Sequence, residues 1–205
     1  MKIIYKKDQV LKLENRKEYK FLYNDYELSN LFLTYKKNLE PLYPDRKISS
    51  MYLDTANFEL YNNSKNTDTD KLKVRFRMYP TDNQIYFEIK RNSDKNKTKV
   101  KELTSYKSFN EIDFKLLEGK HLTPVLKVDY LRSYFTFKNT RITIDKNVSF
   151  QSTVNRSFVN KIINLDFNVV EFKLFNQDKD IEKNFLSNPI AFSKYDYGIK
   201  SIYKI

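Results

Sequence analysis

The chain has 205 residues and carries 38 Lys and Arg against 26 Asp and Glu, a formal net charge of +12. This length suits a domain with its own hydrophobic core, and the positive excess predicts an anionic partner: a phosphorylated compound, an acidic lipid or a nucleic acid. The chain has no cysteine, one histidine (His121, expected at the surface) and two glycines. Thiol chemistry and a Ser-His-Asp triad are therefore excluded, and side chains must hold any phosphate, because glycine-rich phosphate loops need several glycines.

Strands dominate the predicted secondary structure, since Val, Ile, Tyr, Phe and Thr alternate with polar residues in most segments. In chain order we expect strands at 15–23, 47–54, 71–79, 84–91, 97–104, 125–137, 139–146, 150–158 and 168–175. Helices are expected at 26–38, at 109–118 behind a capping box of Ser108 and Glu111, at 178–186 and in the tail from Ser193. The polar segment 62–70 is expected to be a loop. This pattern predicts one α+β domain over residues 1–205, with an antiparallel sheet or barrel.

The polar positions of several predicted strands repeat Lys, Arg and Glu at every second residue, and such side chains share one face about 6.6 Å apart. A solvated sheet face gives the same alternation, so one strand alone decides nothing. The whole set favours an enclosed face with an anionic ligand, because neighbouring like charges on a strand repel one another. The repeated patterns are Lys73-x-Arg75-x-Arg77, Glu18-x-Lys20, Glu88-x-Lys90, Glu171-x-Lys173 and Arg141-x-Thr143-x-Asp145.

The order of these motifs resembles the VTC domain, the catalytic domain of the vacuolar transporter chaperone complex and its bacterial relatives, within the triphosphate tunnel metalloenzyme superfamily. The resemblance covers about residues 14 to 203. It implies a closed antiparallel β-barrel with flanking helices. It also implies a polyphosphate polymerase that transfers the terminal phosphoryl group of ATP to a growing polyphosphate chain, with Mn²⁺ or Mg²⁺. The motifs that carry it are Arg16–Phe21, Ser50–Thr55, Lys73–Arg77, Phe87–Lys90, Arg141–Asp145, Val170–Lys173 and Phe192–Tyr195.

The resemblance also implies the roles of individual residues. Glu171 would hold the metal, and Glu18 and Glu88 would support the neighbouring groups. A further lysine is expected from the strand at 97–104, where Lys99 is preferred over Lys101 on the same face. The residues implied to act on phosphates are Lys20, Arg75, Arg77, Lys90, Arg132, Arg141, Lys173, Ser193 and Lys194.

Two alternatives stay open. CYTH-type triphosphatases carry a Glu-x-Glu-x-Lys strand near the N-terminus, whereas here Arg16 stands at the first Glu position; fewer carboxylates favour transfer to phosphate over hydrolysis. The second alternative is a non-catalytic module for polyphosphate, inositol phosphates or nucleic acid, with aromatics at 130–135 stacking on bases. Repeated glutamates would repel such ligands, so we expect no specific nucleic acid. Without a secretory signal or a membrane segment the protein is expected to be cytoplasmic, and coupling to export would need a membrane partner protein.

Overall fold

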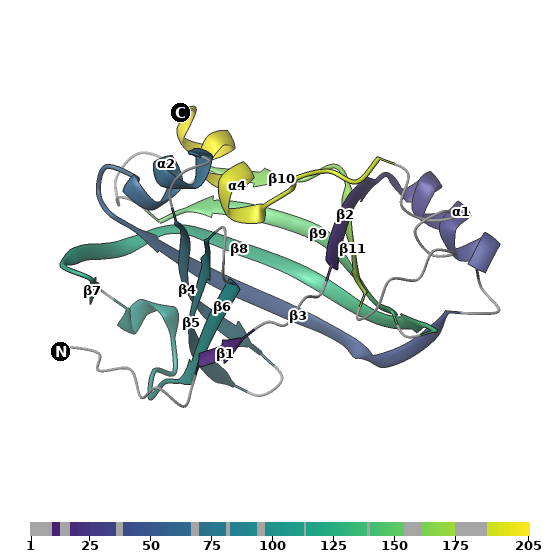
Figure 1. Cartoon of the computed structure of the whole chain (residues 1–205), viewed down its shortest axis with the longest axis horizontal. Coiled ribbons are helices and arrows are strands. Elements are labelled where there is room, and N and C mark those ends of the chain that lie inside the picture. Colours follow the sequence, from purple (N-terminus) through teal and green to yellow (C-terminus); the bar gives the residue numbers. More distant parts are fainter. Residues whose placement is uncertain are drawn as a thin grey trace.

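The computed structural model describes residues 10–12, 17–35, 39–66, 70–80, 83–93, 97–112, 114–138, 140–153, 161–174 and 188–205 (Figure 1). Its helical elements are α1 (Asp25–Tyr35), α2 (Glu59–Lys65), the 3-10 turn η2 (Phe109–Glu111) and α4 (Lys194–Tyr203). Its strands are β1 (Val10–Lys12), β2 (Lys17–Tyr23), β3 (Glu40–Asp54), β4 (Lys71–Tyr79), β5 (Gln84–Asn92), β6 (Lys97–Leu103), β7 (Lys115–Leu117), β8 (Lys120–Phe137), β9 (Thr140–Ser152), β10 (Ile162–Asn164) and β11 (Asn168–Leu174).

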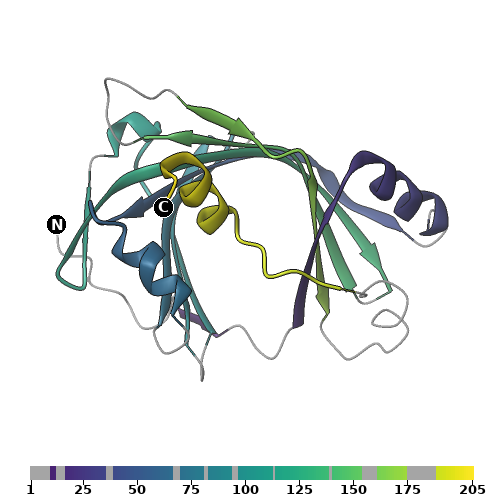
Figure 2. The same cartoon turned by 90° about the horizontal axis from the view of Figure 1, so that it is seen from above.

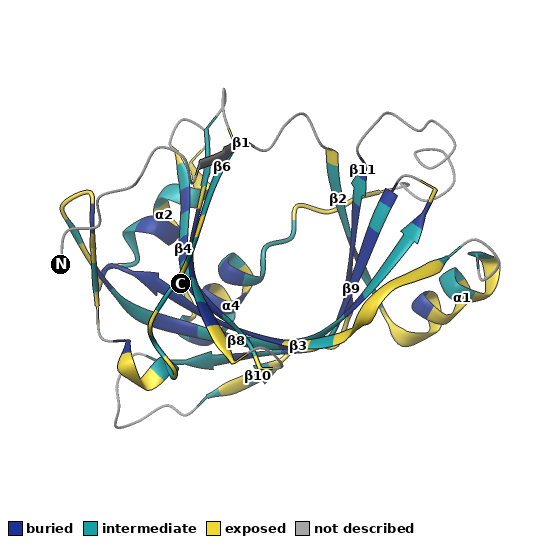
Figure 3. Ribbon diagram, turned by 90° about the horizontal axis from the view of Figure 1, so that it is seen from below, coloured by how far each residue is buried: buried dark blue, intermediate teal, exposed yellow. Residues whose placement is uncertain are grey.

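The strands form one antiparallel sheet in the order β1-β6-β5-β4-β3-β8-β9-β11-β2, with β10 beside β9 and β7 beside β8. Figure 3 shows this sheet bent into a trough. We call β4, β5 and β6 the first wall, β11 and β2 with the adjoining part of β9 the second wall, and β3, β8 and the rest of β9 the floor. A register shift opposite Asp129 and Leu131 of β8 marks a bulge in β9, where Asn147 has φ 51°. Bulges bend a strand, and this one lies where β9 passes from wall to floor.

The expected closed barrel is not formed by the described residues. The ladder ends at β1 on one side and at β2 on the other, and the described pairings do not join these two edges. The first edge is only three residues long, so it offers few groups for further pairing. The α+β class and the antiparallel sheet are as predicted, but the described sheet is open.

Each wall buries its apolar side chains on the face that points away from the trough. The first wall packs Val74 and Phe87 against Ile112, which follows η2. The second wall packs Phe172 against Leu28 of α1, and Figure 3 shows α1 outside the trough. Because side chains alternate along a strand, this apolar outer face turns the charged positions inward.

The helix α4 packs at one end of the trough against the floor. Its Tyr195 and Ile199 share a core cluster with Leu126 and Phe150 of β8 and β9. At Gly198 the helix approaches the floor so closely that a Cβ atom would lie 2.6 Å from Leu126 Cδ2. Figure 2 shows the segment before α4 running from the second wall toward the first. The helix therefore fixes the position of residues 192–194 inside the trough.

Most strands lie where the sequence predicts them, and the differences have local causes. The expected strand 139–146 and the beginning of the expected strand 150–158 belong to one strand, β9; residues 154–158 lie outside the described residues. The expected helix 109–118 is wrong beyond its cap: both capping-box hydrogen bonds of Ser108 and Glu111 form, but they close only the 3-10 turn, and β7 pairs with β8 instead of continuing a helix. Part of the expected loop 62–70 is helix α2. The expected helix 178–186 lies outside the described residues.

His121 is exposed, as expected, but it belongs to β8 rather than to a loop. In the part of the chain that the structure describes, no helix combines the length and the apolar character needed to span a membrane.

Candidate functional site

The trough encloses a cavity of about 700 Å³. Among the described residues, twelve basic side chains and three glutamates line it, so the lining carries a strong positive excess. This excess matches an anion with several charges. The basic residues are Lys20, Arg46, Lys73, Arg75, Arg77, Lys90, Lys99, Lys101, Arg132, Arg141, Lys173 and Lys194, and the acidic ones are Glu18, Glu88 and Glu171.

All thirteen residues that the resemblance implied lie in this lining, together with Lys101. On β4 the residues Lys73, Arg75 and Arg77 face the cavity, while the intervening Val74 and Phe76 lie in the outer core. The alternation seen in the sequence therefore sorts charge inward and apolar surface outward. The structure brings the predicted residues together around one cavity.

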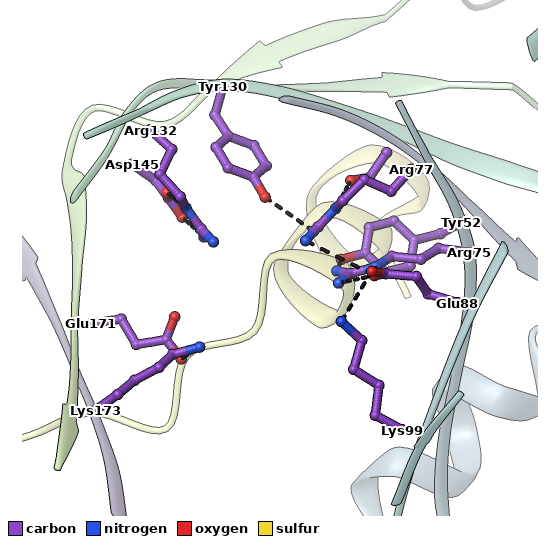
Figure 4. Close-up of polar contacts among 11 residues, drawn as sticks. Tyr52, Arg75, Arg77, Glu88, Lys99, Tyr130, Arg132, Asp145, Glu171 and Lys173 are labelled. Carbon is purple, nitrogen blue, oxygen red and sulfur yellow. Dashed lines mark hydrogen bonds and ion pairs between the residues drawn. The ribbon is translucent and has the colours of Figure 1, made fainter. Parts of the chain in front are cut away.

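The first charge cluster lies on the first wall and is centred on Glu88, which is 2% exposed. Arg75 donates to Glu88 Oε2 from Nε at 2.8 Å and from NH2 at 2.6 Å, and Lys99 Nζ lies 3.0 Å from Oε1. Arg77 NH1 lies 3.9 Å from Glu88 Oε2 (Figure 4). Burial would raise the pKa of Glu88, but the charges of Arg75, Arg77 and Lys99 hold that pKa well below its ordinary value. Glu88 is therefore an anion that orients three cations.

Two buried tyrosines form hydrogen bonds with the guanidinium groups of Arg75 and Arg77. Tyr52 accepts a hydrogen bond from Arg75 NH1 at 2.9 Å, and Tyr130 accepts one from Arg77 NH2 at 3.0 Å. Burial would raise the pKa of Tyr52, but Arg75 and Arg77 outweigh it and lower that pKa. Each guanidinium is thus held by the Glu88 carboxylate and by a tyrosine hydroxyl, and Arg77 Nε also donates to Ser50 Oγ at 3.1 Å.

The second charge cluster joins the floor to α4. Asp145 of β9, which is 2% exposed, accepts from Arg132 Nε at 2.5 Å and from Arg132 NH2 at 2.7 Å. Lys194 Nζ donates to the same carboxylate at 2.5 Å. Burial would raise the pKa of Asp145, whereas Arg132 and Lys194 lower it well below its usual range. Asp145 was seen in the sequence pattern but not assigned a role; Arg132 stands opposite it on the neighbouring strand, whereas Lys194 comes from a distant segment.

The third charge cluster lies on the second wall, opposite Glu88 in Figure 4. Lys173 Nζ lies 3.3 Å from Glu171 Oε1 and 3.7 Å from Glu18 Oε1. Glu171 is 9% exposed. Burial would raise its pKa, but Lys173, Lys20 and Arg132 lower it overall, while Glu18 acts in the opposite sense. Two carboxylates on neighbouring strands therefore share one lysine.

This third cluster is the part of the site that suits a divalent cation. In the described residues no group of three or more Asp, Glu, His or Cys comes together. Mg²⁺ is commonly held by one or two carboxylates and by phosphate oxygens rather than by a protein cage. Glu171 and Glu18 fit that pattern best, because their ion pairs with Lys173, at 3.3 and 3.7 Å, are longer than the shortest pairs that hold Glu88 and Asp145, at 2.6 and 2.5 Å. The site therefore fits a cation that binds together with phosphates.

The start of α4 contributes the last part of the site. Lys73 Nζ donates to Ser193 Oγ and to Asp196 Oδ2, both at 2.7 Å, and Lys20 Nζ donates to the Phe192 carbonyl oxygen at 2.9 Å. Ser193 caps α4 by accepting from the Asp196 amide at 3.3 Å. Residues of both walls thus hold this segment in place.

Behind this segment, Asp54 links α4 to α2. Asp54 is fully buried and accepts from the amides of Thr55, Leu60 and Tyr61 at 2.7 to 3.0 Å, and from the Tyr195 hydroxyl. Burial raises the pKa of Asp54 despite these hydrogen bonds. One carboxylate therefore ties the end of β3 to both helices that flank the site.

Several lining residues were not assigned from the sequence. Lys73 was noticed in the alternation on β4. It lies two residues before Arg75, so it shares the same strand face, and this spacing was a sufficient signal to predict it as a site residue. Lys101 was weighed against Lys99, and both line the cavity: Lys99 contacts Glu88, while Lys101 lies 3.7 Å from the centre of the Tyr86 ring. Arg46 and Tyr43 carry no such signal, because irregular register in β3 obscures which side chains face inward. Tyr79, Tyr86 and Tyr134 do lie two residues from cavity-facing charges on their strands, but an aromatic residue on a strand is ordinarily part of a core.

Comparison with known families gives a match to the model of the VTC domain over residues 15–112 and 95–203, which together span most of the chain. No curated protein matches the sequence.

Solved structures share the fold at low sequence identity. A candidate adenylate cyclase of Bacillus halodurans aligns with a TM-score of 0.58 and 12% identity, over 92% of this chain and 98% of that one. The PH1819 protein of Pyrococcus horikoshii aligns with a TM-score of 0.55 and 14% identity, over 92% and 98%. The candidate adenylyl cyclase HpAC1 of Hippeastrum, described as having a dominant triphosphatase activity, aligns with a TM-score of 0.54 and 12% identity, over 90% and 95%. Identities this low establish a common fold and leave the activity to be argued from the site.

Proposed function

This chain belongs to the VTC domain family, and we propose that it is a polyphosphate polymerase that acts as a single tunnel-fold domain. The enzyme transfers the terminal phosphoryl group of ATP to the end of an inorganic polyphosphate chain. The observation that carries this proposal is the cavity itself, in which cations from both walls, the floor and α4 face one another. A linear polyanion is the ligand that such a lining neutralises along its length.

A protein catalyses phosphoryl transfer mainly by aligning the donor and acceptor phosphates and by stabilising their charge, rather than by covalent chemistry. In the proposed reaction, an oxygen of the acceptor's terminal phosphate forms a bond to the γ-phosphorus of ATP. The bond from that phosphorus to the bridging oxygen breaks, and ADP leaves. No protein nucleophile is needed, which agrees with a chain that has no cysteine and with a single histidine that lies exposed on β8.

We assign different phosphate groups of the ligand to different charge clusters. Arg75, Arg77 and Lys99 are held in fixed orientations by Glu88 and bind one group of phosphates. Arg132 and Lys194, held by Asp145, bind phosphates on the floor. Fixed cations of this kind stabilise the charge of the transferring group without reorganising during the reaction.

The pKa values of Lys99 and Lys173 also bear on phosphate binding. Burial lowers the pKa of each, and nearby glutamates offset this lowering only in part. A bound phosphate favours the charged form of both lysines, because an opposite charge nearby raises a lysine pKa. Phosphate binding and lysine protonation therefore support each other.

A divalent cation would be held by Glu171 and Glu18 together with phosphate oxygens. When bound, it would neutralise phosphate charge and polarise the phosphoryl group. The polymer and its metal thus meet at the second wall, where the carboxylates lie.

A triphosphatase is the second candidate, and the activity described for the Hippeastrum protein of the same fold favours it. In a triphosphatase, water takes the place of the acceptor phosphate. Glu171 and Glu18 are the described carboxylates placed to orient that water, but both contact Lys173, and this contact lowers the pKa of Glu171 and so its strength as a base. This contact is our reason to prefer transfer to phosphate.

One assay separates the candidates. Purified protein is incubated with ATP and Mn²⁺, and the products are separated by gel electrophoresis and assayed for free phosphate. The proposal predicts ADP and a phosphate polymer in matching amounts. Release of free phosphate without polymer would establish the triphosphatase, and binding of ATP without either product would identify a non-catalytic module.

A further inference from the structure

Tyrosines gather at the end of the cavity that lies away from α4. On β4 the inward positions are occupied by cations until the strand ends in Tyr79. On the antiparallel neighbour β5, Tyr86 stands opposite Arg77, so it lies toward the same end. On β8, Tyr134 follows Arg132 on the same face and pairs with Tyr43 of β3. Four tyrosines from four strands thus line one end.

These rings form two edge-to-face pairs at the same end of the cavity. Tyr79 and Tyr86 pack edge to face, with ring centres 6.0 Å apart and planes at 75°. Tyr43 and Tyr134 do the same at 5.5 Å and 87°. Burial raises the pKa of Tyr134, and the nearby Arg132 opposes this rise. Edge-to-face packing leaves ring faces available to a third planar group.

Cations border this tyrosine group. Lys101 Nζ lies 3.7 Å from the centre of the Tyr86 ring and 5.5 Å from that of Tyr79, and Arg46 Cζ lies 5.7 Å from that of Tyr43. Tyr43 is 53% exposed, so the group is open to solvent on one side. The combination of aromatic rings with basic side chains is the composition that binds nucleobases in sequence-tolerant sites.

The charged part of the cavity suits phosphates. The tyrosine rings suit a planar group, which a phosphate chain does not have. We propose that the tyrosine group (Tyr43, Tyr79, Tyr86 and Tyr134) is the subsite for the base of a nucleoside triphosphate, whose phosphates extend inward to Arg77 and Arg75. This inference rests on the proposed use of a nucleotide as phosphoryl donor. Tyr79 and Arg75 are four residues apart on β4, about 13 Å along the strand, which is comparable to an extended nucleotide from base to terminal phosphate.

The subsite predicts loose selection among bases. Stacking depends on a flat π surface that every base has, and it requires no hydrogen bond to the edge of the base. Discrimination between ATP and GTP should therefore be small. Discrimination between ATP and tripolyphosphate, which lacks a base, should depend on the rings.

The test measures binding of ATP and of tripolyphosphate by isothermal titration calorimetry, with the full chain. Tyr86→Leu and Tyr134→Leu remove one ring from each edge-to-face pair, and Tyr86→Phe keeps the ring without its hydroxyl. Tyr26→Leu, at a tyrosine that is 75% exposed on α1, is the matched control. Each of the first two variants should weaken ATP binding roughly tenfold, as expected for loss of a stacked base, and should change tripolyphosphate binding by less than about twofold. Tyr86→Phe should restore ATP binding.

The two proposals fail in different ways. Equal weakening of ATP and tripolyphosphate, or no weakening of either, would overturn the base subsite while leaving the phosphate cavity intact. Failure of the unaltered protein to bind either ligand would overturn the proposed function and the subsite with it. Loss of ATP binding in Tyr86→Phe would also overturn stacking, because the ring is still present.

Discussion

Glu88→Gln removes the negative charge at the centre of the first charge cluster while keeping the size of the side chain. In the folded protein, Glu88 is 2% exposed and lies within 3.9 Å of three cationic groups, from Arg75, Arg77 and Lys99. Loss of one partner from a buried ion pair costs about 3–5 kcal/mol, because the opposite charges remain buried without compensation. We therefore expect the free energy of unfolding at pH 7 to fall by about that amount.

The pH dependence follows from the direction of the pKa shift. The pKa of Glu88 is lower in the folded chain than its ordinary value of 4.5. Its stabilising contribution is therefore complete above about pH 5 and is lost as the pH falls below the unfolded value toward the folded one. The difference in unfolding free energy between the unaltered protein and Glu88→Gln should accordingly be largest at pH 7 and shrink by pH 3.

Urea denaturation followed by circular dichroism measures this difference. The exposed Glu40, at the start of β3, gives the matched control: Glu40→Gln should change the unfolding free energy by less than about 0.5 kcal/mol. A loss below about 1 kcal/mol in Glu88→Gln, or a loss that is the same at pH 7 and pH 3, would show that Glu88 does not organise the cations. The metal requirement of the reaction should stay unchanged, since Glu88 is already occupied by cations.

The remaining predictions concern the other parts of the site. Glu171→Gln should abolish metal-dependent turnover of ATP while the circular dichroism spectrum is retained, and turnover at the original rate would remove its assigned role. Asp54→Asn should cost about 1–3 kcal/mol and speed hydrogen exchange at the Leu60 amide; exchange at the original rate would contradict the link between β3 and α2. Gly198→Ala should lower the melting temperature through a loss of about 1–3 kcal/mol, because the added methyl group meets the buried Leu126. A higher melting temperature, as helix propensity alone would give, would refute that packing.

The period-two pattern predicted the strands and the composition of the cavity because it is a local property. On a strand, Arg75 and Arg77 share one face regardless of the tertiary structure, because side chains alternate between the two faces. The neighbouring Val74 must then lie on the opposite face, toward the outer core. The capping box at Ser108 shows the limit of local signals. Both of its hydrogen bonds form, yet the following residues gain more by pairing with β8 than by extending a turn.

The partners within the site were less accessible to sequence reasoning. Asp145 binds Lys194, and Lys73 binds Asp196, across long separations in the chain, so no spacing rule indicates either pair. The tyrosine group was also hidden, since an aromatic residue on a strand is ordinarily part of a core. Whether a curved sheet closes depends on the meeting of its edge strands, a property of the whole fold that no single motif encodes.

The described sheet ends at β1 and at β2, and the way its two walls are connected affects the energetics of ligand binding. The first wall and the second wall are connected through the floor, and Lys90 of the first lies 3.7 Å from Glu18 of the second. Their separation can change by elastic bending of β3, β8 and β9, without rupture of any ladder of backbone hydrogen bonds. A polyanion that touches both walls pulls them together against this elasticity. The measured affinity for a phosphate chain therefore includes the work of bending the sheet, and long chains that span both walls should stiffen the molecule more than short ones.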